Sequence, residues 1–349
     1  MKFGFEKKAP VEIGIYTLGD HIPHPETGQR IPAKQRIQEI IQLAVAAEDA
    51  GLDFVGIGES HQDYFVTQAH TVILGAIAQE TEKIKIGSSS TILSTLDPVR
   101  VYEDFATIDA ISDERVEIVA GRASRTGVFD LLGYDRADYH ELYEEKLELF
   151  QEINQKESVT WEGEFRAPLE DATVLPRAQR EIPLWRAVGG APASAIAAGK
   201  ANIPMMMAYL AGPIEPFQTT VMHYRKADEE AGHDPDQLPL TVAGFFFTAE
   251  TTDQAIQEAF PYFHEGMILT NGSGIPKRTF AQAKHPESIL NIGDPDFLVE
   301  KLLYQHERLG FQRYIGQLDF GGVPFDKQME MIDILGSKVA PALRKHTGK

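Results

Sequence analysis

Three polar residues that could carry out acid–base chemistry directly follow a short apolar run of the chain. The run DFVGIG (residues 53–58) ends at Glu59, Ser60 and His61. Histidine titrates near neutral pH, and it can transfer a proton or form hydrogen bonds with a ligand. The same three residues could also simply close a turn, so their position in the fold has to decide between the two roles.

Hydroxyl residues follow a second apolar run. After KIKIG, four of them stand in a row from Ser88 to Thr91. Such a row is unusual for a strand of a protein core. It could form a polar turn, or a narrow backbone platform against a flat ligand.

Two further positions suit an anion such as a phosphate group. Arg122 follows the run RVEIVA and Gly121, and its planar guanidinium can bind two phosphate oxygens at once. Gly189 and Gly190 enter a predicted helix that contains Ser194, and free N–H groups at a helix N-terminus bind anions. A solvated arginine and an ordinary glycine turn are the alternatives. Together the two positions indicate a site for a phosphorylated cofactor.

His21 and His24 follow the first apolar run and raise the question of a metal ion. A protein zinc site needs three or four ligands, and two nearby histidines supply only part of such a set. We therefore expect a loop that carries two histidines, and no metal site.

These residues follow short strand-type runs that alternate with longer helix-type runs. Asp97 and Pro98, for example, are typical of the N-cap and first position of a helix. Strand–helix repetition predicts parallel strands, and eight such units favour a closed (β/α)8 barrel over an open doubly wound sheet. The predicted strands are 11–18, 53–58, 83–88, 115–120, 183–189, 203–208, 240–248 and 312–318; the predicted helices are 34–50, 67–81, 98–112, 139–154, 192–200, 214–231, 251–266, 295–309 and 325–345.

The predicted architecture is one α/β domain over residues 1–349, a single (β/α)8 TIM barrel with insertions after strands 4 and 7. The first insertion covers about residues 125–182. The second covers residues 267–293, whose Gly, Pro, Asn and Ser content predicts a long loop or lid. Chemistry in such barrels lies beyond the C-terminal ends of the strands, which is where the polar residues described above fall.

The composition excludes several classes of function. Lys and Arg total 33 against 52 Asp and Glu, and the net charge of −19 argues against nucleic-acid and anionic membrane partners. The absence of cysteine excludes disulfides, thiolate nucleophiles and Cys-ligated zinc. No apolar run reaches the ~18 residues that span a bilayer, and the first residues lack the apolar core of a signal peptide. We therefore expect a soluble cytoplasmic protein.

Four stretches in this order resemble the bacterial luciferase-like flavin monooxygenases. They are AAEDAGLDFVGIGESH (46–61), KIKIGSSS to GRAS (83–124), PLWRAVGGAPAS (183–194), and GDPDFLVEKLLYQHERLG followed by PALR (293–310 and 341–344). The likeness covers almost the whole chain. It implies a (β/α)8 barrel that binds FMN, receives reduced flavin from a separate reductase, and uses O₂ to oxidise a small organic substrate.

The resemblance also implies roles for individual residues. A non-proline cis peptide after the third strand would fall between Ser89 and Ser90 and support the flavin ring, and Tyr209 would lie beside that ring. The cofactor-binding residues that it implies are Ser89, Ser90, Arg122, Ser124, Gly189, Gly190, Ser194 and Tyr209.

The chain departs from luciferase itself at two positions. Luciferase has Glu-His-His after the second strand, where this chain has Glu59, Ser60 and His61, and the family's reactive thiol falls at Gly121. We therefore expect oxygenation without light emission, with His61 and Glu59 as the catalytic candidates. Helices 67–81 and 98–112 are similar to the family's dimer-forming helices and predict a homodimer.

Other functions stay open. Related barrels use a deazaflavin for hydride transfer without O₂, and a flavin-binding protein without turnover is a further alternative. A metal-dependent hydrolase fits least, because the histidines are scattered. The substrate is not readable from the sequence; we expect its pocket to be lined by residues 125–140, Thr17, Tyr209 and the segment 267–293.

Overall fold

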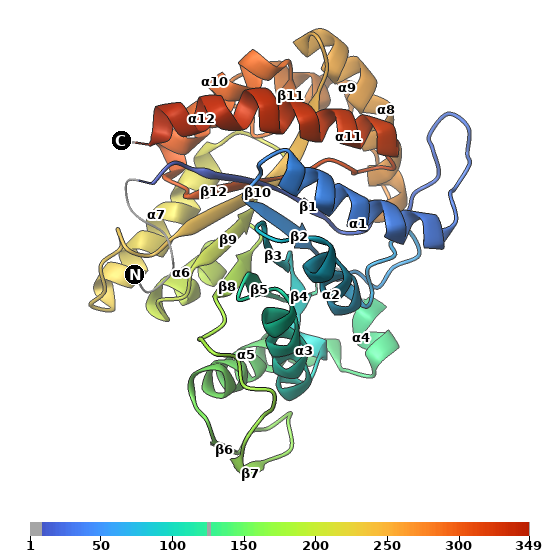
Figure 1. Ribbon diagram of the computed structural model, residues 1–349. Helices are drawn as coiled ribbons and strands as arrows, with labels where there is room; N and C mark the ends of the chain where they lie inside the picture. Colours follow the sequence, from blue (N-terminus) through green and yellow to red (C-terminus); the bar gives the residue numbers. More distant parts are fainter. Residues whose placement is uncertain (1–8, 124–126, 349) are drawn as a thin grey trace.

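Parallel strands close into a barrel at the centre of the molecule (Figure 1). The computed structural model describes residues 9–123 and 127–348, and within them eight parallel strands each pair with the next until the last pairs with the first. This confirms the predicted (β/α)8 TIM barrel. The barrel strands are β1 (Glu12–Thr17), β2 (Phe54–Ile57), β3 (Lys85–Ser88), β5 (Val116–Gly121), β8 (Leu184–Val188), β9 (Met205–Ala208), β10 (Leu240–Thr248) and β12 (Arg313–Gln317).

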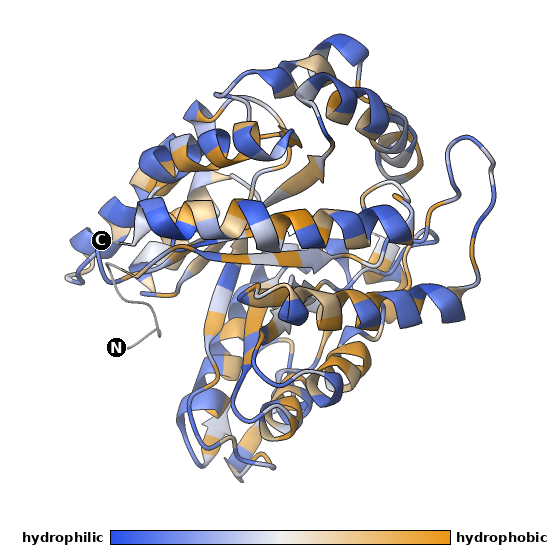
Figure 2. Ribbon diagram, turned by 45° about the horizontal axis from the view of Figure 1, so that its top comes forward, coloured by the Kyte–Doolittle hydropathy of each residue, from blue (hydrophilic) through white to orange (hydrophobic). Residues whose placement is uncertain are grey.

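Helices surround the barrel, and local sequence explains where they begin and end. α3 (Pro98–Ile111) begins after Asp97, whose side chain accepts a hydrogen bond from the N–H of Val99. α10 (Pro295–Leu309) ends at Gly310, which adopts the left-handed conformation that glycine favours. Polar and apolar residues alternate around the helices, as Figure 2 shows. Within the described ranges, no helix has both the length and the apolar composition needed to cross a membrane. The other long helices are α1 (Ala33–Asp49), α2 (His70–Glu80), α5 (Tyr139–Gln155), α6 (Pro192–Lys200), α7 (Glu215–Glu230), α8 (Thr252–Asn271), α11 (Phe325–Ile334) and α12 (Ala340–Thr347).

A buried ion pair lies among the apolar side chains inside the barrel. Arg313 Nη1 donates to Glu117 Oε2 at 2.8 Å, and its guanidinium lies over the rings of Phe54 and Trp185 at 4.4 and 5.4 Å. Burial alone would raise the pKa of Glu117, but the Arg313 guanidinium outweighs it and holds that pKa below its usual value. The interior is therefore a packed core, and a ligand has to bind at the mouth.

The connection between β5 and β8 contains more than one barrel helix. It begins with the short helix α4 (Gly127–Leu132), continues through α5, which packs against α3, and ends in an antiparallel hairpin of β6 (Val159–Trp161) and β7 (Leu169–Ala172). In Figure 1 this hairpin projects away from the barrel.

The segment 267–293 differs from its prediction as a long loop. α8 continues through Asn271, a short helix α9 (Lys277–Phe280) follows, and β11 (Asn291–Gly293) pairs with β10. Buried apolar side chains at Phe280, Ile289 and Ile292 order this segment. Its Gly and Pro residues suggested a loop, and Gly272, Gly274 and Pro276 do fall in the short connection between α8 and α9.

Candidate functional site

A turn with a cis peptide bond lies at the C-terminal mouth of the barrel, between the ends of β2, β3 and β5. The bond joins Ser89 and Ser90, as the resemblance implied. Gly56 in β2 makes room for it, because a Cβ atom there would lie 2.1 Å from Ser89 Oγ. Gly121 does the same in β5, where a Cβ atom would lie 2.2 Å from Ser90 Oγ. A larger residue at position 121, the family's thiol position, would therefore displace Ser90.

Glu59 and His61 lie beside this turn and contact each other. Glu59 is buried, and its Oε1 lies 2.6 Å from His61 Nε2. Its Oε2 accepts the N–H of Ile92 at 2.6 Å, and its own N–H donates to the carbonyl of Ser90 at 2.8 Å. The structure thus brings together Glu59, His61, Ser89 and Ser90, which the sequence analysis selected from two separate runs.

His61 and Ser60 border a small hollow together with Glu59 and Gln62, so its walls are partly polar. Ile92, Ala123 and Val128 line the other side of this hollow. An imidazole at the edge of such a hollow can exchange a proton with a bound molecule, while the three apolar side chains limit the access of water from their side.

A second histidine, His70, lies on the other side of the Glu59 carboxylate and was missed by the sequence analysis. His70 is 2% exposed, and its Nε2 lies 2.8 Å from Thr91 Oγ1. Its Nδ1 lies 3.9 Å from Glu59 Oε2. Burial lowers the pKa of His70, which outweighs the opposite effect of Glu59, so the ring is neutral at pH 7. His70 lies in the first turn of α2, at helical spacing from the buried Ile73 and Ile77, and this spacing was the available signal.

Arg122 lies at the end of β5, next to the end of β8. The register pairs Ala120 with Arg186, which brings Arg122 level with the residues that lead into the Gly189–Gly190 turn. Its guanidinium lies over Tyr139 and Tyr143 at 5.4 and 5.5 Å. Within the described residues its hydrogen bond is to His140 at 3.1 Å, and it forms no ion pair with a carboxylate. The charge of Arg122 is therefore available to an anionic ligand.

The Gly189–Gly190 turn leads into α6, as predicted. Gly190 has a φ of +86° and its carbonyl accepts the Thr220 hydroxyl at 2.7 Å. As far as the described chain shows, α6 begins at Pro192 without a side chain that caps its N-terminus, so its first N–H groups are available to an anion. Ser194 is buried, in the first turn of α6.

Arg186 and Tyr143 add to this end of the site and were also missed by the sequence analysis. Arg186 is buried, lies 4.9 Å over the ring of Tyr143, and donates to Ser194 Oγ at 3.4 Å and to Glu144 at 2.9 Å. Arg122 therefore shares the Tyr143 ring with a second, already paired arginine. Ser124, the remaining predicted residue near Arg122, lies outside the described residues.

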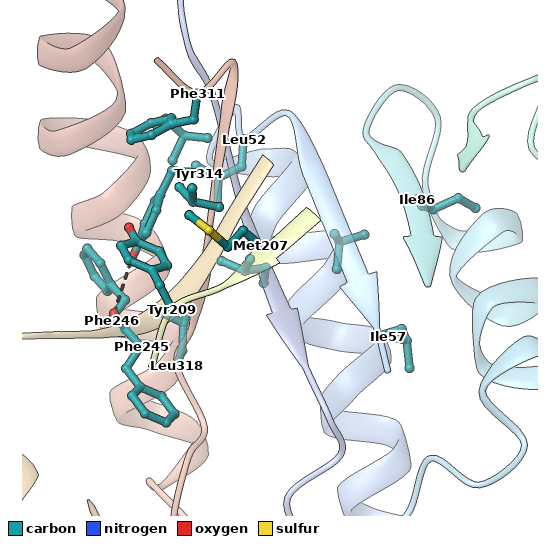
Figure 3. Packing of buried hydrophobic residues seen from close by; sticks show 14 of the residues in the cluster. Leu52, Ile57, Ile86, Met207, Tyr209, Phe245, Phe246, Phe311, Tyr314 and Leu318 are labelled. Atoms are coloured by element: carbon teal, nitrogen blue, oxygen red, sulfur yellow. Dashed lines mark hydrogen bonds between the residues drawn. The ribbon is translucent and has the colours of Figure 1, made fainter. Parts of the chain in front are cut away.

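Tyr209 is not brought together with these residues. Met206 points into the barrel interior, so the alternation of a strand turns Tyr209 outward. Its hydroxyl donates to Gln305 Oε1 at 2.9 Å and accepts from Asn291 Nδ2 at 3.3 Å, and Figure 3 shows its ring packed beside Tyr314. Burial raises the pKa of Tyr209 well above its usual value. Thr17 also faces outward, and its hydroxyl donates to Asp319.

His21 and His24 use their ring nitrogens in protein hydrogen bonds. His21 Nε2 lies 2.6 Å from the carbonyl of Ile31, and its Nδ1 accepts from Arg30 at 3.0 Å. His24 Nδ1 accepts a backbone N–H, and its Nε2 lies 3.4 Å from the Tyr262 hydroxyl. Among residues 9–123 and 127–348 there is no group of three or more metal-ligating side chains that could hold an ion.

The fold and the site define a (β/α)8 barrel whose mouth carries a contacting Glu59–His61 pair and, beside the N-terminus of α6, the Arg122 guanidinium. The model of the luciferase-like monooxygenase family matches residues 11–313, and the chain belongs to this family.

Similar proteins include both monooxygenases and F420-dependent enzymes. The N-acetyl-S-alkylcysteine monooxygenase of Bacillus subtilis is 24% identical over 78% of this chain and 80% of its own length. The F420-dependent glucose-6-phosphate dehydrogenase of Segniliparus rotundus is 22% identical over 88% of this chain and 94% of its own. The oxygenating constituent of 3,6-diketocamphane monooxygenase from Pseudomonas putida, solved in complex with FMN, has the same fold. Its TM-score is 0.77 at 18% identity, over 95% of this chain and 98% of that one.

Proposed function

We propose that the protein is an FMN-dependent monooxygenase, which uses reduced flavin from a separate reductase and O₂ to oxidise a small organic molecule. The observation that carries the proposal is the anion-binding end of the site. Arg122 lacks a carboxylate partner within the described residues, and it lies at the strand end next to the N-terminus of α6. A terminal phosphate is the ligand that a guanidinium and a helix N-terminus bind together.

The residues at the mouth fit a flavin. Arg122, the Gly189–Gly190 backbone and Ser194 would hold the phosphate, and the Ser89–Ser90 turn would face the ring system. Ser89 Oγ is buried without a hydrogen-bond partner in the described part of the chain, so a polar group of a ligand that reached this turn would satisfy it. Reduced FMN, when bound, supplies the electrons for the reaction with O₂.

The chain's own contribution to the chemistry is placement, proton transfer and exclusion of water. His61 would exchange a proton with the bound reactants, and Glu59 would orient its ring through the 2.6 Å contact. The apolar side chains of Ile92, Ala123 and Val128 would keep water from the reacting atoms.

Binding of FMN and of F420 to the purified protein, each followed by fluorescence quenching, tests the choice of cofactor. We expect FMN to bind in the micromolar range. Binding of F420 without binding of FMN would instead favour an F420-dependent oxidoreductase, the second candidate, which the Segniliparus rotundus relative supports.

A second measurement separates an enzyme from a flavin carrier. Reduced FMN and O₂ are supplied with a panel of small organic substrates, and oxygenated product is quantified by mass spectrometry. Turnover that falls in His61→Gln, while FMN affinity is retained, supports the enzyme. Oxidation of the reduced flavin with release of hydrogen peroxide from O₂, and with no product from any substrate, supports the carrier.

We also propose a cytoplasmic homodimer that associates through α2 and α3. Val72 on α2 is 72% exposed and Ile111 on α3 is 47% exposed, both high for apolar side chains. Val72→Glu should convert the dimer to a monomer in light scattering, whereas Met222→Glu, on the exposed side of α7, should not. A monomeric wild type would overturn this proposal.

A further inference from the structure

The Glu59 carboxylate has a different contact at each of its oxygens. Oε1 lies 2.6 Å from His61 Nε2. Oε2 accepts the N–H of Ile92 at 2.6 Å and faces His70 Nδ1 at 3.9 Å. The side chain of Glu59 is 1% exposed, that of His61 11% and that of His70 3%. A buried carboxylate with three protein groups around it has little freedom to turn.

The charged and titratable groups that face His70 favour one arrangement of its hydrogen. They are Glu59 from the β2–α2 connection, His61, and Asp104 from α3. Asp104 already accepts the hydroxyl of Thr71 at 3.1 Å and pairs with Arg100 at 2.9 Å. A neutral His70 with its hydrogen on Nδ1 points that hydrogen at Glu59, and its Nε2 then accepts the hydroxyl of Thr91.

The same reasoning assigns the hydrogen of His61. A carboxylate can only accept hydrogen bonds, so the His61 nitrogen at 2.6 Å from Glu59 must carry a hydrogen. A neutral imidazole has one N–H, which leaves the other nitrogen as its basic atom. In the described residues His61 Nδ1 has no hydrogen-bond partner.

We propose that His70 is a positioning residue, which acts through Glu59 to fix His61 in the Nε2–H tautomer and to make Nδ1 the nitrogen that exchanges a proton at the site. This proposal rests on the proposed function for the use of that proton, but the tautomer itself is a property of the chain alone. Ser60 is then not required for the arrangement, because each link runs through Glu59.

Nitrogen NMR of the histidine rings tests this without any cofactor. The full chain is labelled with ¹⁵N-histidine, and long-range ¹H–¹⁵N spectra are recorded above neutral pH, with His61 assigned by the loss of its signals in His61→Gln. We expect wild-type His61 to show a protonated Nε2 and an unprotonated Nδ1. The opposite pattern in the wild type would overturn the proposal.

Three variants test the contacts that join His70 to Glu59 and Glu59 to His61. Glu59→Gln should replace the single pattern of His61 by a mixture of tautomers, because a carboxamide can donate as well as accept. His70→Leu should also produce a mixture, whereas His70→Gln, which keeps a donor toward Glu59, should restore most of the wild-type pattern. His306→Leu is the matched control, because His306 is a largely buried histidine on α10 that bonds the carbonyl of Phe311; it should leave His61 unchanged.

The spectrum of each variant tests the role of one residue in setting the His61 tautomer. If His70→Leu unfolds, Glu59→Gln and His70→Gln still carry the test. A wild-type pattern in Glu59→Gln would show that the carboxylate does not set the tautomer, and a wild-type pattern in folded His70→Leu would show that His70 plays no part. Failure of FMN to bind would remove the proposed function but leave these spectra, and therefore this inference, intact.

Discussion

Removing the Arg122 side chain should weaken binding of FMN through its phosphate and leave the ring contacts intact. Arg122→Ala deletes a charged donor that has no carboxylate partner within the described residues and that two tyrosine rings already hold in place. Hydrogen bonds to charged groups contribute about 1.5–3 kcal/mol. Arg122 is only half-buried, so we expect the lower part of this range, a loss of roughly 10- to 50-fold in affinity.

The assay compares two ligands that differ in the phosphate. Dissociation constants of FMN and of riboflavin, which lacks the phosphate, are measured by fluorescence quenching for the wild type, Arg122→Ala and Arg100→Ala. Arg100 lies on the exposed face of α3 and pairs with Glu103 and Asp104, so its removal changes the net charge equally. Arg122→Ala should weaken FMN binding and leave riboflavin binding unchanged, and Arg100→Ala should affect neither.

Two results would refute this reasoning. An FMN affinity of Arg122→Ala within about twofold of the wild type would mean that Arg122 does not bind the phosphate. An equal loss for FMN and riboflavin would mean that the arginine supports the mouth of the barrel and not the phosphate.

Three further predictions concern buried polar groups. Glu117→Ala leaves Arg313 buried without its main partner and should lower the free energy of unfolding, measured in urea titrations, by about 3–5 kcal/mol. Because the pKa of Glu117 is lowered in the folded chain, the wild type should be more stable than the variant above the pKa that Glu117 has in the unfolded chain. This difference in stability should disappear as acid protonates the carboxyl. Burial lowers the pKa of Lys301 to about 7. Between that pH and the usual lysine pKa the unfolded chain therefore binds one more proton than the folded chain, and the free energy of unfolding should rise with pH by up to about 1.4 kcal/mol per pH unit. Lys301→Met should remove this slope. Tyr209→Phe removes the hydrogen bond to Gln305 and should lower the free energy of unfolding by about 1–2 kcal/mol without changing the affinity for FMN. A loss of FMN affinity without a loss of stability would instead show that Tyr209 contacts the cofactor.

The barrel could be predicted because its signals are local and repeated. Asp97 and Pro98 mark a helix start, and the structure begins α3 there. The segment 267–293 could not be predicted in the same way. It is ordered by contacts with distant residues, such as the pairing of Asn291 with Phe246 and the bonds from Lys301 to two of its carbonyls.

The candidate site could be predicted where a side chain directly follows a strand. Glu59 and Arg122 come immediately after buried strands, and in a parallel barrel all such positions meet at one mouth. His70 and Arg186 were missed because they lie within a predicted helix and a predicted strand of the core, and not directly after a strand. The resemblance implied that Tyr209 lies beside the flavin ring, whereas the structure buries its side chain against Gln305 and Asn291; one step of strand alternation decides whether a side chain enters the barrel or leaves it.

The structural and the chemical role of Glu59 are not alternatives. Its two oxygens and its N–H bond His61, Ile92 and Ser90, and they thereby join the residues that follow β2 to those that follow β3. The same bonds fix the direction of the carboxylate, and a carboxylate with a fixed direction is what an imidazole needs to present one defined basic nitrogen. Because the second histidine of the luciferase motif is the one in contact with Glu59, replacing the first by Ser60 leaves this arrangement complete. The polar residues after β2 therefore join two strand ends, and the same bonds orient the candidate acid–base residue.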